Sequence, residues 1–277
     1  MPVDARRLSC PDFAFPSLDR DGRLALVRLL GFAQVDLELR VPLPPVAPTQ
    51  EAVARLRGAV AAGGLAVADV FFVLGGDDFA ASAINHRDDT LRTAHRVAFA
   101  AAARVTRELG APGLTILPGV PWADDPEGGW RCAVDELRWR VETAHAEGVE
   151  TRIEAHIGSL VSTPELAARI VADVPGLRLS LDPTHFTMQA IAPERIVALA
   201  PLAGHVHVRG SRPGFLQVAW ERDEGAVAEL LAALESAGYD GAICVEYVPM
   251  AKWNCDTMDI LGATAATRAA LLSGELG

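Results

Sequence analysis

Four residues with metal-binding side chains stand at the ends of apolar, strand-like runs in this 277-residue chain. These residues are Glu154, Asp182, His207 and Glu246, and roughly 25 to 40 residues separate each from the next. Three carboxylates and one imidazole form a ligand set suited to a divalent cation. The residue types therefore predict a metal site, provided that the fold brings the four strand ends together.

The alternation of apolar and amphipathic segments along the chain predicts a fold that brings the four strand ends together. Short apolar runs alternate with longer amphipathic stretches, which is typical of strand–helix–strand units around a parallel sheet. About eight units are present, the number that a closed (β/α)8 TIM barrel requires, and the carboxyl ends of all strands in such a barrel converge on one face. The predicted strands are residues 8–13, 33–39, 66–74, 114–117, 151–155, 177–181, 205–208 and 242–247. The predicted helices lie near 21–31, 49–62, 88–109, 130–147, 164–174, 193–200, 225–237 and 257–272.

The same pattern favours a single domain that covers residues 1–277. The length suits one large domain or two small ones, and no linker or low-complexity segment interrupts the alternation. A doubly wound open sheet is the main alternative for an α/β chain. The Gly-rich phosphate-binding fingerprint that opens a helix after the first strand of such sheets is missing. We therefore predict an α/β fold of the single-barrel type.

The acids also have a simpler interpretation, as rim residues paired with arginines, and for one isolated glutamate that interpretation is favoured. A series of four such residues, at corresponding ends of consecutive units, favours a metal site instead. An ionised carboxylate within an apolar run is costly unless a cation compensates it. The carboxylate-rich ligand set favours Mn²⁺, Mg²⁺ or Co²⁺ and leaves Zn²⁺ open.

Three further histidines near strand ends are candidates for substrate binding. His156 shares a face with Glu154 because side chains alternate along a strand, and it either contacts substrate or has a structural role. His185 follows Asp182 in the next loop and is expected to contact substrate or a metal-bound water. His86, after the third predicted strand, either reaches the barrel mouth or is a solvated loop residue.

The seventh predicted strand places His205, His207 and Arg209 on one face. His205 lies deeper in the strand and is expected to be a hydrogen-bonded interior histidine. Arg209 begins the segment 209–214, which follows the strand where barrels often bind phosphate or carboxylate groups. The sequence leaves open whether this segment binds such a group or forms a turn whose arginines balance an acidic surface.

The composition and net charge argue against nucleic acid and membranes as partners. The chain is 50% hydrophobic and 22% charged, with a formal net charge of −11 and a pI near 5.1. The resulting field repels phosphate backbones and anionic lipid, so no nucleic acid is expected as a partner. The longest apolar region, 59–76, is broken by two glycines and an aspartate, which argues against a membrane span. The sequence does not decide between a monomer and a homo-oligomer.

Cysteine usage and the amino-terminal residues predict a cytoplasmic protein. The four cysteines lie far apart and form no C-x-x-C motif, so reduced thiols are expected. The first residues lack the long apolar stretch of a signal peptide. Nucleophilic catalysis has little support, because no G-x-S-x-G motif is present and no cysteine pairs clearly with a histidine and an asparagine or aspartate.

Several motifs in the second half of the chain resemble those of the xylose isomerase-like TIM barrels, the group of sugar phosphate isomerases and epimerases. They are residues 153–159 (IEAHIGS), 181–186 (LDPTHF), 205–210 (HVHVRG) with Gln217 following, and 245–247 (VEY). The resemblance implies that Glu154, Asp182, His207 and Glu246 hold one divalent ion. It also implies that His185 and Arg209 lie near the substrate.

The chain departs from the endonuclease IV branch of these barrels. That branch builds a three-zinc cluster with additional histidines, including an Asp-x-His after the ligand on the seventh strand. Residues 221–224 read ERDE here, and the end of the second predicted strand has no histidine either. Together with the net negative charge, this makes an endonuclease IV-like hydrolase the less favoured alternative.

The predicted reaction is isomerisation or epimerisation of a carbohydrate, a sugar or related polyol, through an enediolate. The metal would act as a Lewis acid on adjacent carbonyl and hydroxyl oxygens. Glu154 and Glu246 would then be the catalytic acid and base, one removing the carbon-bound proton and the other returning it. A hydride shift gives the same products. Alternatives are a metal-dependent dehydratase or lyase acting on an inosose or keto-sugar, and a barrel that binds a sugar without turnover.

Overall fold

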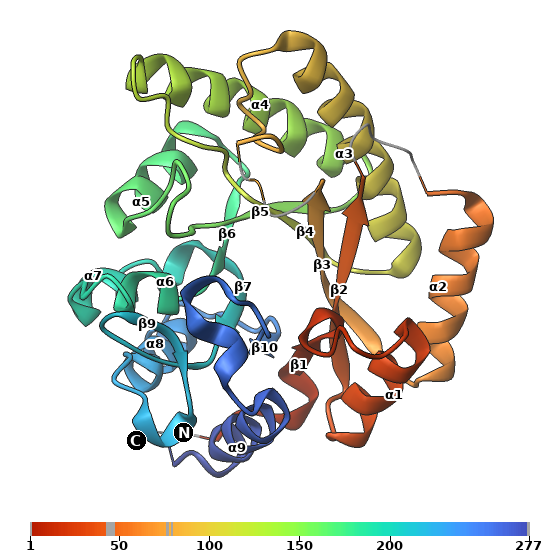
Figure 1. The fold of residues 1–277 in the computed structure, drawn as a ribbon, viewed down its shortest axis with the longest axis vertical. Helices are drawn as coiled ribbons and strands as arrows, with labels where there is room; N and C mark the ends of the chain where they lie inside the picture. The colour runs from red at the N-terminus through yellow and green to blue at the C-terminus, as the bar shows by residue number, and fades with distance from the viewer. Residues whose placement is uncertain (1, 43–47, 76–77, 79, 276–277) are drawn as a thin grey trace.

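The computed structural model describes residues 2–42, 48–75, 78 and 80–275. Within these residues, eight parallel strands close into a barrel in the order β1-β10-β7-β6-β5-β4-β3-β2. Figure 1 shows the helices arranged around these strands. The barrel strands are β1 (Leu8–Pro11), β2 (Gln34–Val41), β3 (Ala66–Leu74), β4 (Gly113–Ile116), β5 (Glu150–Glu154), β6 (Arg178–Leu181), β7 (Ala203–Val208) and β10 (Ile243–Val245). The predicted (β/α)8 TIM barrel is confirmed.

The helices follow the predicted ranges closely. They are α1 (Arg20–Leu29), α2 (Gln50–Ala62), α3 (Asp89–Leu109), α4 (Pro126–Ala146), α5 (Pro164–Asp173), α6 (Thr184–Thr187), α7 (Pro193–Val197), α8 (Val227–Ser236) and α9 (Ile260–Ser273). Helix α4 begins before the predicted residue 130, because Asp125 caps it by accepting the N–H of Gly128 and Pro126 fits the first turn. The sequence did not predict the single-turn helix α6.

A β-hairpin follows β7, formed by β8 (Gly210–Arg212) and β9 (Phe215–Val218). Its turn contains Gly214, whose positive φ of 81° suits a residue without a side chain. The segment 209–214 therefore contains a turn. The guanidinium of Arg212 lies 4.3 Å from the ring centroid of Phe215 and 4.0 Å from Glu224, at the surface.

The barrel strands alternate between apolar and polar residues. On β7, for example, Val206 and Val208 belong to the apolar core between the barrel and the helices, whereas His205 and His207 alternate with them. On β5, Ile153 belongs to the same core. All these residues are fully buried, so the polar side chains face an enclosed lumen rather than solvent.

Contacts between strands that are not neighbours show that the lumen is polar. Nε2 of His205 on β7 lies 2.6 Å from Oδ2 of Asp36 on β2, and Nη1 of Arg152 on β5 lies 2.9 Å from Oδ1 of Asp69 on β3. Neither pair of strands is adjacent in the barrel, so these contacts cross its interior. His205 is thus the hydrogen-bonded interior histidine that the sequence predicted.

The ends of the described chain meet on one side of the molecule. Strand β1 pairs with both β10 and β2, and the N–H of Val3 donates to the carbonyl of Leu271 in α9 at 2.8 Å; Figure 1 shows the two chain ends close together. All four cysteines are free thiols. None of the described helices combines the length and the apolar character needed to cross a membrane.

Candidate metal centre

Four buried side chains meet at the carboxyl ends of β5, β6, β7 and β10. One ligand atom from each of Glu154, Asp182, His207 and Glu246 lies within 4.8 Å of the others. Glu154 is the last residue of β5, His207 is the penultimate residue of β7, and Asp182 and Glu246 directly follow β6 and β10. The apolar neighbours Ile153, Leu181, Val208 and Val245 belong to the core between the barrel and the helices. The parallel register of these strands therefore brings together the four residues that were predicted from the sequence.

The spacing of the ligand atoms fits a shared cation. Nδ1 of His207 lies 3.2 Å from Oε1 of Glu154 and 3.4 Å from Oε2 of Glu246. Two atoms bound to one ion at about 2.0–2.3 Å are separated by roughly 3.0–3.5 Å. Oε2 of Glu246 is buried, and among the described residues its contacts with His207 and with Nη2 of Arg209 lack hydrogen-bond geometry. Buried carboxylates this close repel one another, and a divalent cation would remove that repulsion.

Two members of the cluster hold protons more strongly than they would in water. Burial raises the pKa of Glu154 to about 7, and the charges of Glu246 and Asp182 add to this effect, while His207 opposes it. Burial would lower the pKa of His207, but the surrounding carboxylates of Glu246, Asp36 and Glu154 outweigh it and raise that pKa well above the ordinary value. A metal ion binding to these groups would have to displace protons.

Asp182 is held as an ionised carboxylate. Its Oδ1 accepts hydrogen bonds from the backbone N–H and the hydroxyl of Thr184, at 2.8 and 2.6 Å. Its Oδ2 lies 2.5 Å from Nη2 of Arg209, which also lies 3.2 Å from Oε2 of Glu246. Burial alone would raise the pKa of Asp182, but the Arg209 guanidinium and nearby imidazoles hold it well below its usual range. Arg209 thus contacts two of the predicted ligands.

An aromatic cluster of His156, His185 and Trp253 lies beside the four candidate ligands. The ring centroids of the two histidines are 4.0 Å apart, and the Trp253 ring lies 5.3 Å from His156 and 6.2 Å from His185. Nε2 of His185 is 3.6 Å from Oδ2 of Asp182. Burial lowers the pKa of His156 to about 4 and that of His185 well below its ordinary value, so both rings are neutral at pH 7.

A cavity of about 610 Å³ opens above these residues. Its lining includes five of the residues that sequence reasoning selected: Glu154, His156, His185, Arg209 and Glu246. His86 does not belong to this lining. Its Nδ1 accepts the backbone N–H of Asp88 at 3.0 Å, which closes a turn before α3. The structure therefore does not bring His86 to the other predicted site residues.

Sequence reasoning gave no role to Asp36 or to Phe71. The Phe71 ring lines the cavity and lies 6.5 Å from the ring of His207. Asp36 alternates with apolar neighbours on β2 and faces the lumen, where it contacts both histidines of β7. Asp36 could have been selected as an acid between apolar residues of a predicted strand, which is the pattern that led to the selection of Glu246. Its partners His205 and His207 are more than 160 residues away along the chain, so no local sequence pattern could predict these contacts.

Comparisons with known proteins identify the family and the same fold. A family model described as "Xylose isomerase-like TIM barrel" matches residues 24–265. No curated protein matches the chain.

Several solved structures share the fold at low sequence identity. A D-psicose 3-epimerase from Clostridium cellulolyticum H10, solved with D-tagatose, is 16% identical with a TM-score of 0.75, and the match covers 98% of this chain and 99% of that chain. A 3-keto-D-glucoside 4-epimerase from E. coli is 16% identical with a TM-score of 0.71, over 96% and 99%. A xylose isomerase-like TIM barrel protein from Mycobacterium smegmatis in complex with magnesium is 18% identical with a TM-score of 0.69, over 91% and 87%.

Proposed function

Because the chain belongs to the xylose isomerase-like TIM barrel family, we propose that it is a divalent-metal-dependent isomerase or epimerase of a sugar or sugar-like polyol. The observation that carries this proposal is the pair Glu154 and Glu246. Their carboxylates approach the same nitrogen of His207 from strands β5 and β10, which are separated in the barrel by β6 and β7. Two carboxylates placed around one point can remove a proton from a bound carbon and return one to it.

The metal site of this proposal consists of Glu154, Asp182, His207 and Glu246, whose carboxylate-rich composition favours Mn²⁺, Mg²⁺ or Co²⁺ over Zn²⁺. A divalent ion bound there supplies Lewis-acid polarisation of the substrate's carbonyl oxygen, which makes the neighbouring carbon-bound proton more acidic. One glutamate then takes that proton and the other delivers a proton to the resulting enediolate.

The remaining residues of the cavity bind and orient the substrate. His156 and His185 are neutral. Nδ1 of His156 donates to the carbonyl of Ile157 at 2.6 Å, so its Nε2 can accept a hydrogen bond from a sugar hydroxyl. One ring nitrogen of His185 can donate and the other can accept. Arg209 holds Asp182 and Glu246 in place through its contacts with both. Trp253 packs beside the two histidines and limits the access of water. A cavity of about 610 Å³ is within the usual size range for a small-molecule site.

A keto-sugar is the substrate class that we favour. The solved structures of similar fold include enzymes named as epimerases of D-psicose and of a 3-keto-D-glucoside. A carbonyl group next to the reacting carbon stabilises the negative charge that forms when the proton leaves. The proposal is therefore restricted to sugars and polyol derivatives with a carbonyl adjacent to an epimerisable or isomerisable centre.

The test measures metal content and solvent exchange together. Purified protein is analysed for bound metals and incubated in deuterated water with a panel of ketoses and keto-glycosides, each with Mn²⁺ and with a chelator. We expect one metal equivalent, and deuterium incorporation at a single carbon of one substrate class only when metal is present.

Three other results would each contradict a different part of the proposal. Loss of the mass of water identifies a dehydratase or lyase. Product formation without deuterium indicates a hydride shift, which contradicts proton transfer by the two glutamates but leaves a metal-dependent isomerase. Ligand-dependent thermal stabilisation without turnover of that ligand identifies a sugar-binding barrel.

A further inference from the structure

A polar column lies in the barrel lumen directly beneath the proposed metal centre. It includes Asp36, His205, Asp69 and Arg152, and each of these residues is at least nine-tenths buried. At the lower end, Arg152 pairs with Asp69 at 2.9 Å. At the upper end, Asp36 faces the two histidines of β7. The proposed reaction does not use Asp36, although it is a fully enclosed acid in contact with a predicted metal ligand.

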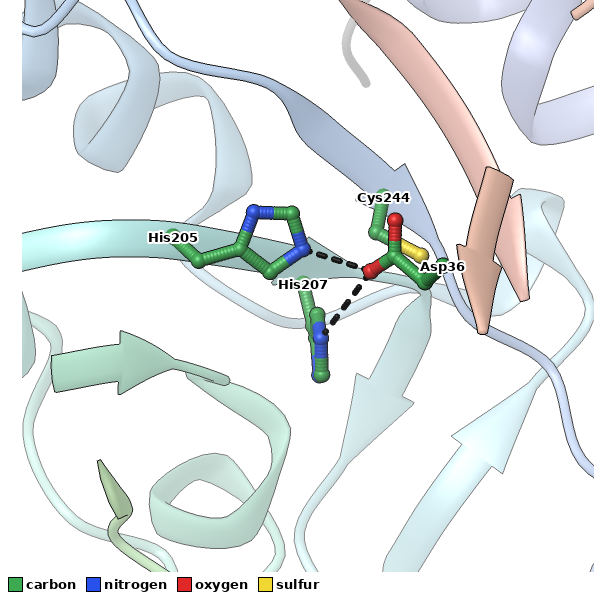
Figure 2. A group of neighbouring side chains, drawn as sticks. All are labelled: Asp36, His205, His207 and Cys244. Carbon is green, nitrogen blue, oxygen red and sulfur yellow. Dashed lines mark hydrogen bonds and ion pairs between the residues drawn. The ribbon is translucent and has the colours of Figure 1, made fainter. Parts of the chain in front are cut away.

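One oxygen of Asp36 is approached by two imidazole nitrogens. Figure 2 shows Nε2 of His205 and Nε2 of His207 directed at Oδ2 of Asp36, at 2.6 and 3.7 Å. The two rings are nearly perpendicular, with an interplanar angle of 87° and centroids 5.1 Å apart. The 2.6 Å contact is a strong hydrogen bond to a charged acceptor. It fixes the Asp36 carboxylate between the rings.

The two nitrogens of His207 therefore face different surroundings. Nδ1 faces the carboxylates of Glu154 and Glu246 at 3.2 and 3.4 Å. Nε2 faces Asp36 at 3.7 Å and the hydroxyl of Ser180 at 3.4 Å. A neutral imidazole carries a proton on one nitrogen only, and a metal ion binds the other. A cation bound at Nδ1 would offset the charges of Glu154 and Glu246 on that side, and the negative charge of Asp36 then favours the proton on Nε2.

We propose that Asp36 is a positioning residue that holds His207 in the Nε2–H tautomer and so presents Nδ1 to the metal, while His205 holds Asp36 in place. Carboxylates beside the second nitrogen of a metal-bound histidine commonly fix its orientation and raise its affinity for the metal. At 3.7 Å, Asp36 acts on Nε2 through its charge, while the hydroxyl of Ser180 lies at 3.4 Å. The inference rests on the metal site of the proposed function. It adds a residue that lies outside the four proposed ligands and does not line the cavity.

A second metal ion is the competing explanation for this cluster. Asp36, His205, His207 and Cys244 also offer one ligand atom each, within 4.8 Å of one another. Two atoms bound to one ion are separated by roughly 3.0–3.5 Å. The 2.6 Å between His205 and Asp36 is too short for that and is the length of a hydrogen bond. The distances therefore favour a positioning carboxylate over a second ligand set.

The test compares metal affinity in Asp36→Ala, Asp36→Asn and Asp69→Asn with that of the full-length wild-type protein. Mn²⁺ dissociation constants are measured by competition with a fluorescent chelator, and the thermal midpoint without metal shows whether each variant is folded. We expect Asp36→Ala to bind Mn²⁺ about 10- to 100-fold more weakly. Asp36→Asn keeps the volume and one acceptor oxygen, so we expect a smaller loss.

Asp69→Asn is the matched control. Asp69 is the register partner of Asp36 on β3 and is equally enclosed, but its carboxylate pairs with Arg152 and not with a histidine of the metal site. A purely structural role for lumen acids would weaken metal binding in both variants to the same extent. We expect Asp69→Asn to lower the thermal midpoint while its Mn²⁺ affinity stays within about threefold of wild type.

The tautomer of His207 gives a readout that stability does not influence. Nitrogen-15 correlation spectra of the Mg²⁺-loaded protein, assigned with a His207→Gln variant, should show the ring proton on Nε2 in wild type. Asp36→Asn should shift the Nε2 resonance or populate the other tautomer.

Three results would overturn the inference. The first is equal Mn²⁺ affinity in wild type and Asp36→Ala. The second is an Nδ1–H tautomer in the wild-type protein. The third is a second metal equivalent that Cys244→Ser removes, because Asp36 would then be a ligand. Failure of the wild-type protein to bind any metal would instead contradict the proposed function together with this inference.

Discussion

A substitution at Glu246 can remove proton transfer without disturbing the fold. Its Oε2 lies 3.4 Å from Nδ1 of His207 and 3.2 Å from Nη2 of Arg209. Glutamine has nearly the same size as glutamate and keeps one oxygen for these contacts. A glutamine cannot take or deliver a proton at that position. The isosteric replacement therefore removes proton transfer while it leaves the packing around the site in place.

We predict that Glu246→Gln lowers the rate of solvent deuterium exchange by about 100- to 10,000-fold, the usual contribution of a general acid or base. Exchange is measured by NMR at saturating Mn²⁺, so that weaker metal binding does not decide the result. The matched control is Glu165→Gln, a surface residue paired with Arg195 at 2.8 Å, which should retain wild-type exchange. Exchange at the wild-type rate in Glu246→Gln would rule out the two-glutamate mechanism.

Glu154 gives a second prediction, about pH. Burial and neighbouring charges raise its pKa to about 7 in the metal-free protein, whereas an unfolded chain ionises near 4.5. The folded state therefore binds the extra proton between these values. Its contribution to stability is fully present below about pH 4.5 and is lost as the pH rises through 7.

A divalent cation would replace that proton, so its stabilising effect should grow with pH. We predict a larger increase in thermal midpoint on adding Mg²⁺ at pH 7.5 than at pH 5.5, together with proton release on binding. Differential scanning calorimetry measures the first effect, and titration calorimetry in buffers of different ionisation enthalpy measures the second. An increase that is independent of pH would show that Glu154 is not a ligand.

At the scale of elements, the β8–β9 hairpin supports the aromatic cluster. Nε2 of Gln217 on β9 donates to the carbonyls of Val248 and Cys255 at 2.8 and 2.9 Å, and its Oε1 accepts the N–H of Val248 at 3.1 Å. These bonds tie the hairpin to the segment after β10. That segment forms the short helix Lys252–Thr257, which carries Trp253. Trp253 itself has a positive φ of 61°, a strained conformation that the surrounding structure must hold.

We predict that Gln217→Leu raises KM about tenfold and lowers the free energy of unfolding by about 3 kcal/mol, because buried backbone groups lose their partners. Metal affinity should stay within about threefold of wild type, since the proposed ligands lie on the barrel strands and in the loops directly after them. Steady-state kinetics measure KM, urea titration measures the free energy of unfolding, and chelator competition measures the metal affinity. The control is Gln34→Leu, whose side chain bonds the carbonyl of Arg6 away from the cavity. An unchanged KM in Gln217→Leu would show that the hairpin does not position the cluster.

Across the whole barrel, closure brings together segments near the two ends of the described chain. Strand β1 completes the ring by pairing with β10 and β2, and Val3 bonds to Leu271. One contiguous apolar cluster extends from Leu8 to Leu271. On these grounds we propose that residues 1–277 form a single domain.

A single domain predicts one cooperative unfolding transition, because no group of strands can separate without breaking the ring. In calorimetry, the calorimetric enthalpy should equal the van't Hoff enthalpy, and EDTA should lower the midpoint without splitting the peak. Two resolved transitions would contradict the single-domain proposal. A midpoint unaffected by EDTA in a metal-loaded sample would instead count against the metal site.

The barrel, and the grouping of four candidate ligands at its mouth, could be predicted from the amino-acid sequence. The alternation of apolar runs with amphipathic stretches is a local property, and the convergence of carboxyl ends follows from closure of a parallel sheet alone. Glu154, Asp182, His207 and Glu246 could therefore be grouped from their places at strand ends. We did not predict the single-turn helix α6 or the β8–β9 hairpin, because these segments are too short to show a hydrophobic periodicity.

Which polar residues meet across the lumen could not be predicted in this way and became clear from the folded barrel. Asp36 and His205 are 169 residues apart and lie on strands that are not neighbours, so their contact depends on the stagger of the closed ring and not on any local pattern. The same holds for His86. Its place after β3 predicted a position at the cavity, but its ring accepts the backbone N–H of Asp88 in a turn outside the cavity lining. Strand periodicity fixes the face on which a side chain lies, whereas its partner on that face is set by the packing of the whole barrel.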